Sequence, residues 1–98
     1  MPAYYVYILK CIDSKGNVSY YTGSTKNLLK RFQQHQKGEG ARYTKGKKLK
    51  MVHYETYTTL TEARRREAAI KKWPQARKIE LIKEKDSEKK NGDNGEKG

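Results

Sequence analysis

The sequence is poor in cysteine and in long apolar segments. Cys11 is the only cysteine among 98 residues, so no disulfide can form within the chain, and its place in an apolar stretch predicts a small buried side chain. No stretch approaches the roughly 18 apolar residues of a membrane span, and no charged start precedes an apolar run. We therefore expect no signal peptide, no membrane association and a cytoplasmic protein.

Acidic residues are also scarce. The chain has 11 acidic and 23 basic side chains, which gives a net charge of +12. Residues 85–98 carry four charges of each sign, so the whole excess lies in residues 1–84. A folded body with this surplus is typical of proteins that bind a polyanion such as DNA or RNA. Solubility is the alternative explanation, but mixed charges would provide solubility without so large a surplus.

Two short stretches rich in aromatic and β-branched residues open the chain, at 4–12 and 18–23. The turn-forming sequence Asp-Ser-Lys-Gly-Asn separates them, and this pattern predicts a β-hairpin. Residues 4–12 are apolar on both alternating faces, which is typical of a central strand covered on both sides. Tyr7 and Tyr21 lie in the two strands, and tyrosines on one face of an antiparallel pair can share a pocket. In so basic a chain, two paired phenols favour phosphate chemistry.

A helix is expected next, from N-cap candidates at 24–27 to about residue 37, with Gly-Glu-Gly at 38–40 ending it. Three apolar residues fall in one sector of ~100° and predict its buried side: Leu28, Leu29 and Phe32. Arg31 and His35 are four residues apart and therefore neighbours on the helix, at the border of that sector. Their tips can lie in a cleft while the helix faces the sheet.

Residues 37–50 show no periodicity and predict a flexible basic loop, because they combine six basic side chains and three glycines with one acid. The loop is either a solvated linker or a segment that follows phosphates, with one aromatic ring able to stack on a base. The candidate nucleic-acid-binding residues are Arg42, Tyr43, Lys45, Lys47 and Lys48.

Alternation returns at 51–57 and predicts a third strand. One face of that strand would carry Met51, His53, Glu55 and Tyr57. Thr59 and Glu62 form a capping box that opens a second helix, which should end at Trp73 because Pro74 follows. Pro74 suits the first turn of a third helix. Residues 85–98 contain no apolar side chain and should form a disordered charged tail after a domain at 1–84.

Glu67 is out of place in the second helix. At ~100° per residue it falls within the same stripe as Leu60, Ala63 and Ile70, which is the side expected to be buried. Burial of an unpartnered carboxylate costs several kcal/mol. An ion pair with Arg31 or a lysine would explain its position, and so would a divalent cation.

Taken together, these residues resemble the GIY-YIG nuclease superfamily. The chain has Tyr-Val-Tyr at 5–7, Tyr-Thr-Gly at 21–23, an arginine ten residues after Tyr21, a histidine four residues later and an isolated glutamate on a later helix. The sequences of 4–10, 41–44 and 65–72 resemble, more narrowly, the small stand-alone bacterial members of unassigned role. The resemblance covers roughly residues 4–82. The order and spacing of these motifs are specific when taken together, although each tripeptide alone is a weak pattern.

The resemblance implies an α+β fold, a three-stranded antiparallel sheet flanked by about three helices. It also implies an endonuclease that hydrolyses phosphodiester bonds with one divalent ion, Mg or Mn, held by Glu67. The implied catalytic residues are Tyr7, Tyr21, Arg31, His35 and Glu67. Two departures are that Tyr5 stands where the family's first glycine would be, and that no asparagine lies between Asn27 and Asn91 to match the one some members use.

Phosphodiester hydrolysis fits these residues. Tyr7 would activate water as a phenolate stabilised by nearby cations, and Tyr21 would position the water. Arg31 would hold the scissile phosphate, and His35 would assist it or relay a proton. Glu67 would bind the metal, with waters completing its coordination shell.

The main alternative is a binding module with a nuclease-like fold that grips nucleic acid without cleaving it. A structural or ribosome-associated basic protein would explain the charge but not the position of Glu67. The expected partner is nucleic acid, with DNA favoured, and we expect no small-molecule cofactor. The protein itself should be a monomer or a weak dimer.

Overall fold

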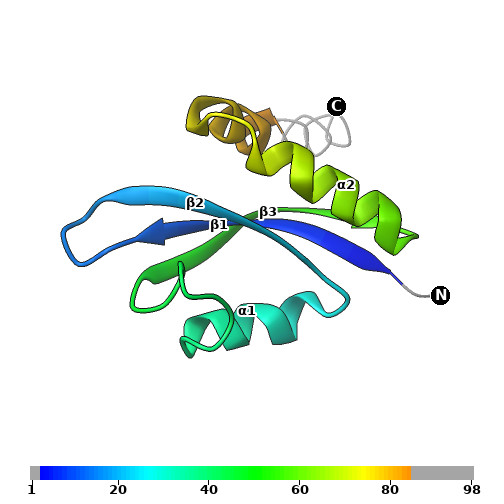
Figure 1. The fold of residues 1–98 in the computed structure, drawn as a ribbon. Helices are drawn as coiled ribbons and strands as arrows, with labels where there is room; N and C mark the ends of the chain where they lie inside the picture. The colour runs from blue at the N-terminus through cyan, green and yellow to red at the C-terminus, as the bar shows by residue number, and fades with distance from the viewer. Residues whose placement is uncertain (1–2, 85–98) are drawn as a thin grey trace, which may run out of the picture.

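The computed structural model describes residues 3–84, in which a three-stranded antiparallel sheet is covered by helices on both faces (Figure 1). The elements in chain order are β1 (Tyr4–Ile12), β2 (Val18–Thr25), α1 (Leu28–Gln36), β3 (Lys48–Tyr57), α2 (Leu60–Lys71) and a further helix at 75–84. The predicted α+β class is confirmed. The tail expected at 85–98 lies outside the described residues.

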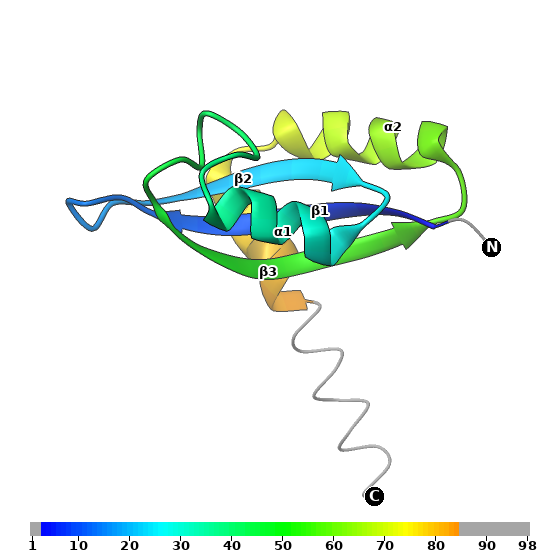
Figure 2. The same cartoon turned by 90° about the horizontal axis from the view of Figure 1, so that it is seen from below.

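β1 is the central strand, as its two apolar faces predict, because the strand order is β2-β1-β3. Val6 and Ile8 are fully buried against Ala63 and Ile70 of α2. The other face of β1 forms a second core with side chains from α1 and β3, made by Tyr7, Leu9 and Cys11 with Leu28, Phe32, Leu49 and Met51. The sheet therefore separates two small cores, and Figure 2 looks onto the face that carries α1.

The hairpin forms where the turn residues predict it. The Asp13 carboxylate accepts hydrogen bonds from the backbone N–H groups of Lys15 and Asn17, both at 2.9 Å, and Gly16 has a φ of +86° that glycine adopts without strain. β2 continues two residues beyond the predicted end at Gly23. This extension places Gly23 directly opposite Tyr7 and Ser24 opposite Val6.

A β-bulge changes the predicted faces of β3. The β1–β3 register shifts between Ile8 and Leu9, so Met51 pairs with Leu9 while His53 pairs with Ile8. A bulge inserts one extra residue and reverses the alternation beyond it. Met51 therefore packs in the core beneath α1, and the prediction that it shares a face with His53 is wrong. β3 also begins three residues earlier than expected.

The helices begin at the predicted caps. Asn27 accepts from the Lys30 N–H at 3.0 Å at the start of α1, and Thr59 accepts from the Glu62 N–H at 3.2 Å at the start of α2. Leu29 is 69% exposed, so its predicted burial is wrong, because α1 meets the sheet along the narrow stripe of Leu28 and Phe32. α2 ends two residues before Trp73. Within residues 3–84, no helix has the length and apolar character needed to cross a bilayer.

Candidate active site

Three side chains form a hydrogen-bonded chain beneath α1. The Tyr7 hydroxyl lies 2.8 Å from Nε2 of His35, and Nδ1 of the same ring lies 2.9 Å from Oγ1 of Thr44. These side chains are almost fully buried, with Tyr7 2% and His35 1% exposed. They come from β1, α1 and the turn at 41–47, so these hydrogen bonds join three segments that are distant in sequence.

The bonding of Thr44 determines the tautomer of His35. The Thr44 hydroxyl donates its single hydrogen to the carbonyl oxygen of Ala41 at 3.1 Å, so it can only accept from the imidazole. The neutral His35 ring therefore carries its hydrogen on Nδ1. Nε2 is then an acceptor, and the Tyr7 hydroxyl donates to it. This arrangement gives the phenol a base positioned to receive its proton.

Glycines make room for both rings. A Cβ at Gly23 would lie 2.5 Å from the Tyr7 hydroxyl oxygen, and a Cβ at Gly40 would clash with Nδ1 and Cγ of His35. The φ of Gly23 is not positive, so this residue is required by space and not by backbone conformation. The glycine of the Tyr-Thr-Gly motif is thus the surface on which the Tyr7 ring rests.

Tyr21 completes an aromatic cluster with these side chains. Its ring centroid lies 6.4 Å from that of Tyr7 and 5.3 Å from that of His35. On another side it stacks on Tyr43, with centroids 6.1 Å apart and planes inclined by 21°. Nζ of Lys47 lies 3.6 Å from the Tyr43 ring centroid. The structure therefore brings Tyr7, Tyr21 and His35 together, as the sequence predicts.

Burial is the largest influence on the pKa values of both Tyr7 and His35. Burial raises the pKa of the Tyr7 phenol well above its usual range, and the charge of Tyr21 acts in the same direction. Arg31 lowers the pKa, as nearby cations were expected to do, but burial outweighs it. Burial, followed by the charge of Arg31, lowers the pKa of His35. These pKa shifts favour a neutral phenol and a neutral imidazole in the chain without substrate, and the phenolate expected at Tyr7 stays a prediction.

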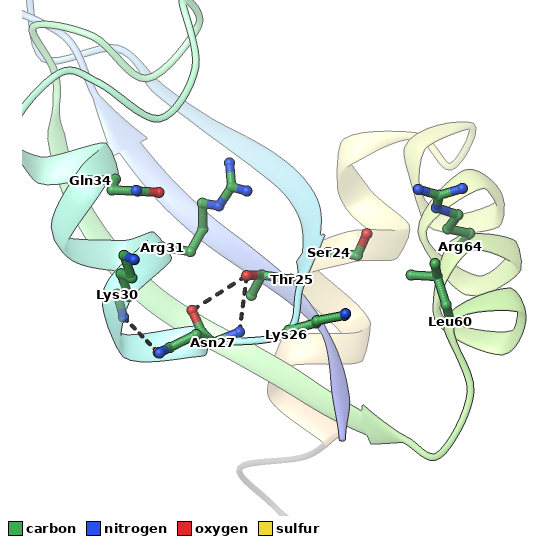
Figure 3. A pocket seen from close by; sticks show the side chains of 9 residues that line it. All are labelled: Ser24, Thr25, Lys26, Asn27, Lys30, Arg31, Gln34, Leu60 and Arg64. Atoms are coloured by element: carbon green, nitrogen blue, oxygen red, sulfur yellow. Dashed lines mark hydrogen bonds between the residues drawn. The ribbon is translucent and has the colours of Figure 1, made fainter. Parts of the chain in front are cut away.

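Arg31 lies one helical turn before His35, half-buried, and it lines a cleft of about 410 Å³ (Figure 3). Among the described residues it has no ion-pair partner. A guanidinium without a carboxylate partner, beside the tyrosine cluster, is suited to bind an oxyanion such as a phosphate.

Glu67 is paired within the protein. Its carboxylate receives a hydrogen bond from the Ser24 hydroxyl at 2.5 Å and forms an ion pair with Nζ of Lys71 at 2.7 Å. Burial acts to raise the pKa of Glu67, but the contacts with Lys71 and Ser24 outweigh burial, so this pKa lies below its usual value. The Glu67 side chain is 18% exposed and that of Lys71 is 52% exposed. Of the explanations weighed from sequence, the structure contains the lysine ion pair, and Arg31 is not the partner.

A metal at Glu67 would have few protein ligands. Within residues 3–84 no group of three or more His, Cys, Asp or Glu side chains converges on one point. Mg²⁺ does not require such a group, because it keeps several waters and is often bound through one or two carboxylates and substrate phosphates. Glu67 and the Ser24 hydroxyl are oxygen donors of the right kind, and the half-exposed Lys71 is free to swing into solvent. The residues present fit one weakly held divalent cation.

The candidate nucleic-acid-binding residues lie in two settings. Arg42, Tyr43 and Lys45 are exposed in the turn at 41–47, with Lys47 half-buried against Tyr43, whereas Lys48 begins β3. The buried Thr44 ties the turn to His35. The prediction of one flexible loop over 37–50 is therefore wrong: the segment is a cationic turn anchored at its centre and followed by a strand.

Sequence reasoning did not place Thr44, Gly40, Ser24 or Lys71 in the candidate active site. It also overlooked a second carboxylate. Glu55 is bound by Arg66 at 2.8 and 3.0 Å, by His53 at 2.8 Å and by the Tyr57 hydroxyl at 2.5 Å. Although burial opposes it, these bonds hold the pKa of Glu55 far below its usual range. Each carboxylate oxygen of Glu55 has two hydrogen-bond partners, so no position is open for a ligand. The cluster joins β3 to α2.

Comparison with known proteins identifies relatives that match most of this chain. Residues 3–80 match the family model of the GIY-YIG catalytic domain. A UPF0213 protein of Syntrophus aciditrophicus is 46% identical over 82 residues, which cover 82% of this chain and 90% of the relative. A UPF0213 protein of Staphylococcus aureus is 41% identical over 86 residues, which cover 87% of this chain and 100% of the relative. A solution NMR structure of a UPF0213 protein from Bacillus halodurans is 32% identical, has a TM-score of 0.49 and covers 83% of each chain. The chain therefore belongs to the GIY-YIG family.

Proposed function

We propose that this chain is a metal-dependent endonuclease that hydrolyses phosphodiester bonds in nucleic acid, with DNA as the favoured substrate. The observation that carries the proposal is the bond from the Tyr7 hydroxyl to His35, whose tautomer Thr44 fixes. A phenol attached to a neutral imidazole can accept a proton at its oxygen while it delivers its own proton to the ring. Such a relay needs no free phenolate in the resting protein.

The attacking water loses its proton in this relay. The water O–H bond breaks as Tyr7 Oη takes that proton, and the Tyr7 hydrogen passes to Nε2 of His35, which becomes a cation. The resulting hydroxide attacks phosphorus, and the bond from phosphorus to the 3′ oxygen breaks. The departing 3′ alkoxide takes a proton from solvent, and His35 then releases to solvent the proton that it gained. The Thr44 hydroxyl keeps accepting from Nδ1 throughout, so the imidazolium retains a partner for each hydrogen.

The remaining residues stabilise charge and hold geometry. Arg31 contributes two parallel donors to the non-bridging oxygens of the scissile phosphate. Tyr21 packs against Tyr7 and His35 and limits the positions that the water can take. The charge of Glu67 helps to raise the pKa of Tyr7, so the two groups lie within electrostatic reach. A divalent cation held by Glu67 and Ser24 would supply positive charge to the phosphate oxygens and oppose that effect on Tyr7.

The test is a cleavage panel of single-stranded, duplex, nicked and branched substrates, with Mg²⁺, with Mn²⁺ and with a chelator. Cleavage of at least one substrate should require the metal and should fall by orders of magnitude in Tyr7→Phe and in Glu67→Ala. Tyr20→Phe is the matched control, because it removes a hydroxyl from the opposite face of β2. An absence of metal-dependent cleavage, or equal cleavage by Tyr7→Phe and the parent, would overturn the proposal.

A binding module without catalysis is the second candidate. One observation favours it: Lys71 and Ser24 already pair the Glu67 carboxylate. This candidate predicts salt-dependent nucleic-acid binding that no divalent ion strengthens, with every substrate of the panel intact.

A further inference from the structure

The cleft lined by Arg31 has no residue of the tyrosine cluster in its walls. Its walls come from the end of β2, the start of α1 and the start of α2 (Figure 3). The lining residues are Ser24, Thr25, Lys26, Asn27, Lys30, Arg31, Gln34, Leu60 and Arg64. Arg31 and Arg64 stand on helices that lie on opposite faces of the sheet, so the cleft passes around the outer edge of β2.

The charge of this cleft is of one sign. Four of its lining side chains are cationic, namely Lys26, Lys30, Arg31 and Arg64, and none of its lining residues is acidic. Within residues 3–84 none of the four forms an ion pair. The ammonium of Lys26 instead lies 5.8 Å from the Tyr4 ring centroid. Four unpaired cations repel one another, and a bound polyanion relieves that repulsion.

The cleft adjoins the candidate active site through two residues. Arg31 belongs to both, and Ser24 lines the cleft while its hydroxyl donates to Glu67. The charge of Arg64 acts on the Glu67 carboxylate, so the two are electrostatic neighbours. The cationic turn at 41–47 lies at the other end of α1, about 12 Å along the helix from Asn27 at ~1.5 Å per residue. Cations therefore lie on both sides of the reactive cluster.

The lining offers no aromatic ring on which a base could stack. No aromatic ring lines the cleft, and Leu60 is its one apolar residue. Single-stranded bases are held by stacking on aromatic side chains, whereas phosphates are held by cations and hydroxyls that carry no sequence information. A free nucleotide would find contacts here for its phosphate but no platform for its base.

We propose that this cleft binds the backbone phosphates that flank the scissile phosphate, on the side away from the turn at 41–47. The inference rests on the proposed function in taking Arg31 as the residue that holds the scissile phosphate. The substrate is then a strand that continues through the site in both directions, with its bond broken internally. Recognition on the cleft side is independent of sequence.

The test compares two variants of equal net charge. The cleft variant carries Lys26→Gln, Lys30→Gln and Arg64→Gln. The control variant carries Lys15→Gln, Arg65→Gln and Lys83→Gln, which are exposed residues outside the cleft and outside the turn at 41–47. Binding to a fluorescent duplex is measured in a chelator between 50 and 200 mM salt, so the measurement does not require cleavage. Circular dichroism and melting curves confirm that both variants are folded.

If each substituted cation contacts one phosphate, the slope of log K against log salt becomes shallower by about 2.7 in the cleft variant. Between 50 and 200 mM salt the parent then loses about 40-fold more affinity than the cleft variant. The control variant keeps the slope of the parent. Equal slopes for the cleft and control variants would overturn the inference.

Two further measurements separate the possible failures. If no substrate is cleaved but the cleft variant alone changes slope, the proposed catalysis fails and the cleft remains a phosphate-binding surface. In the second measurement, millimolar inorganic phosphate is added during melting. If it raises the melting temperature of the parent but not that of the cleft variant, while the two proteins have equal salt slopes for duplex binding, the cleft is a site for small anions. The inference is then overturned.

Discussion

The Tyr7 ring rests on Gly23, its partner on β2, and a Cβ at Gly23 would lie 2.5 Å from the hydroxyl oxygen of Tyr7 and 2.7 Å from its Cζ. Tyr7 is 2% exposed and its hydroxyl is bonded to His35, so the ring has no free direction in which to move. One glycine therefore fixes the position of the proposed proton acceptor.

We expect Gly23→Ala to lower the free energy of unfolding by about 1–3 kcal/mol, the usual cost of an extra methyl group in a packed site. It should also displace the Tyr7 hydroxyl from His35 and reduce cleavage. Urea unfolding in the parent and Tyr7→Phe backgrounds measures the effect, because Tyr7→Phe removes the atom closest to the new methyl group. The cost should be smaller in the Tyr7→Phe background, and an identical cost in both would contradict the steric explanation.

Thr44 should matter through its hydroxyl. Thr44→Val keeps the shape but leaves the buried Nδ1–H of His35 without an acceptor, at a cost of about 1–3 kcal/mol. The tautomer of His35 is then no longer fixed, so cleavage should fall as well. Thr44→Ser restores the hydroxyl and is the matched control, with stability and activity closer to the parent. If Val and Ser variants unfold at the same urea concentration, the hydrogen bond contributes nothing.

Stability should rise with pH across the titration of His35. Burial lowers the pKa of folded His35 below its usual value of 6.5, so between the two values the unfolded chain binds a proton that the folded chain does not. Stability is therefore complete above about pH 6.5 and is lost as pH falls below it. The lowered pKa of Glu55 acts in the same direction but in a lower range, because it removes stability only as pH falls below about 4.5.

Urea unfolding at several pH values between 5 and 7.5 measures this dependence. The quantity compared is the slope of unfolding free energy against pH in the parent and in His35→Gln. The variant should show a shallower slope. An equal slope in both proteins would show that His35 titrates alike in the folded and unfolded chains.

The sheet was predictable from sequence because its central strand is unambiguous. Residues 4–12 are apolar on both faces, which places that strand between two partners. Its pairing with β2 then brings Tyr7 and Tyr21 onto one face of the sheet. Lys48 and Lys50 were misplaced in a loop because charge concealed a real alternation with Leu49 and Met51. The bulge beside Met51 could not be predicted either, since it depends on pairing with β1.

The partners of the candidate catalytic residues were less predictable. Thr44 lies in a turn with no periodicity, and its burial exists only because His35 approaches it from α1. Ser24 and Glu67 are 43 residues apart and meet because α2 passes along the edge of β2. Local patterns indicate which residues are unusual, whereas tertiary packing decides which groups they meet.

Glu67 and Lys71 provide the last prediction. Of the explanations that the sequence leaves open for Glu67, the structure contains an ion pair of 2.7 Å whose lysine is half-exposed. Glu67→Gln keeps an acceptor for Ser24 and loses only this pair, so without metal it should cost less than about 1 kcal/mol. Lys71→Met removes the competing ammonium and leaves the carboxylate intact. If Glu67 serves a divalent cation, Lys71→Met should bind Mn²⁺ more tightly than the parent, and Glu67→Gln should not bind it.

Melting curves with and without Mn²⁺ distinguish these outcomes, because a ligand that binds the folded state raises the melting temperature according to its concentration and affinity. The expected order of the metal-induced increase is Lys71→Met, then the parent, then Glu67→Gln with none. Lys72→Met, which removes the adjacent exposed lysine, is the matched control and should behave as the parent. If Lys71→Met lowers stability by several kcal/mol and gains no response to Mn²⁺, then Glu67 is a structural partner of Lys71. The binding module would then be the better supported function.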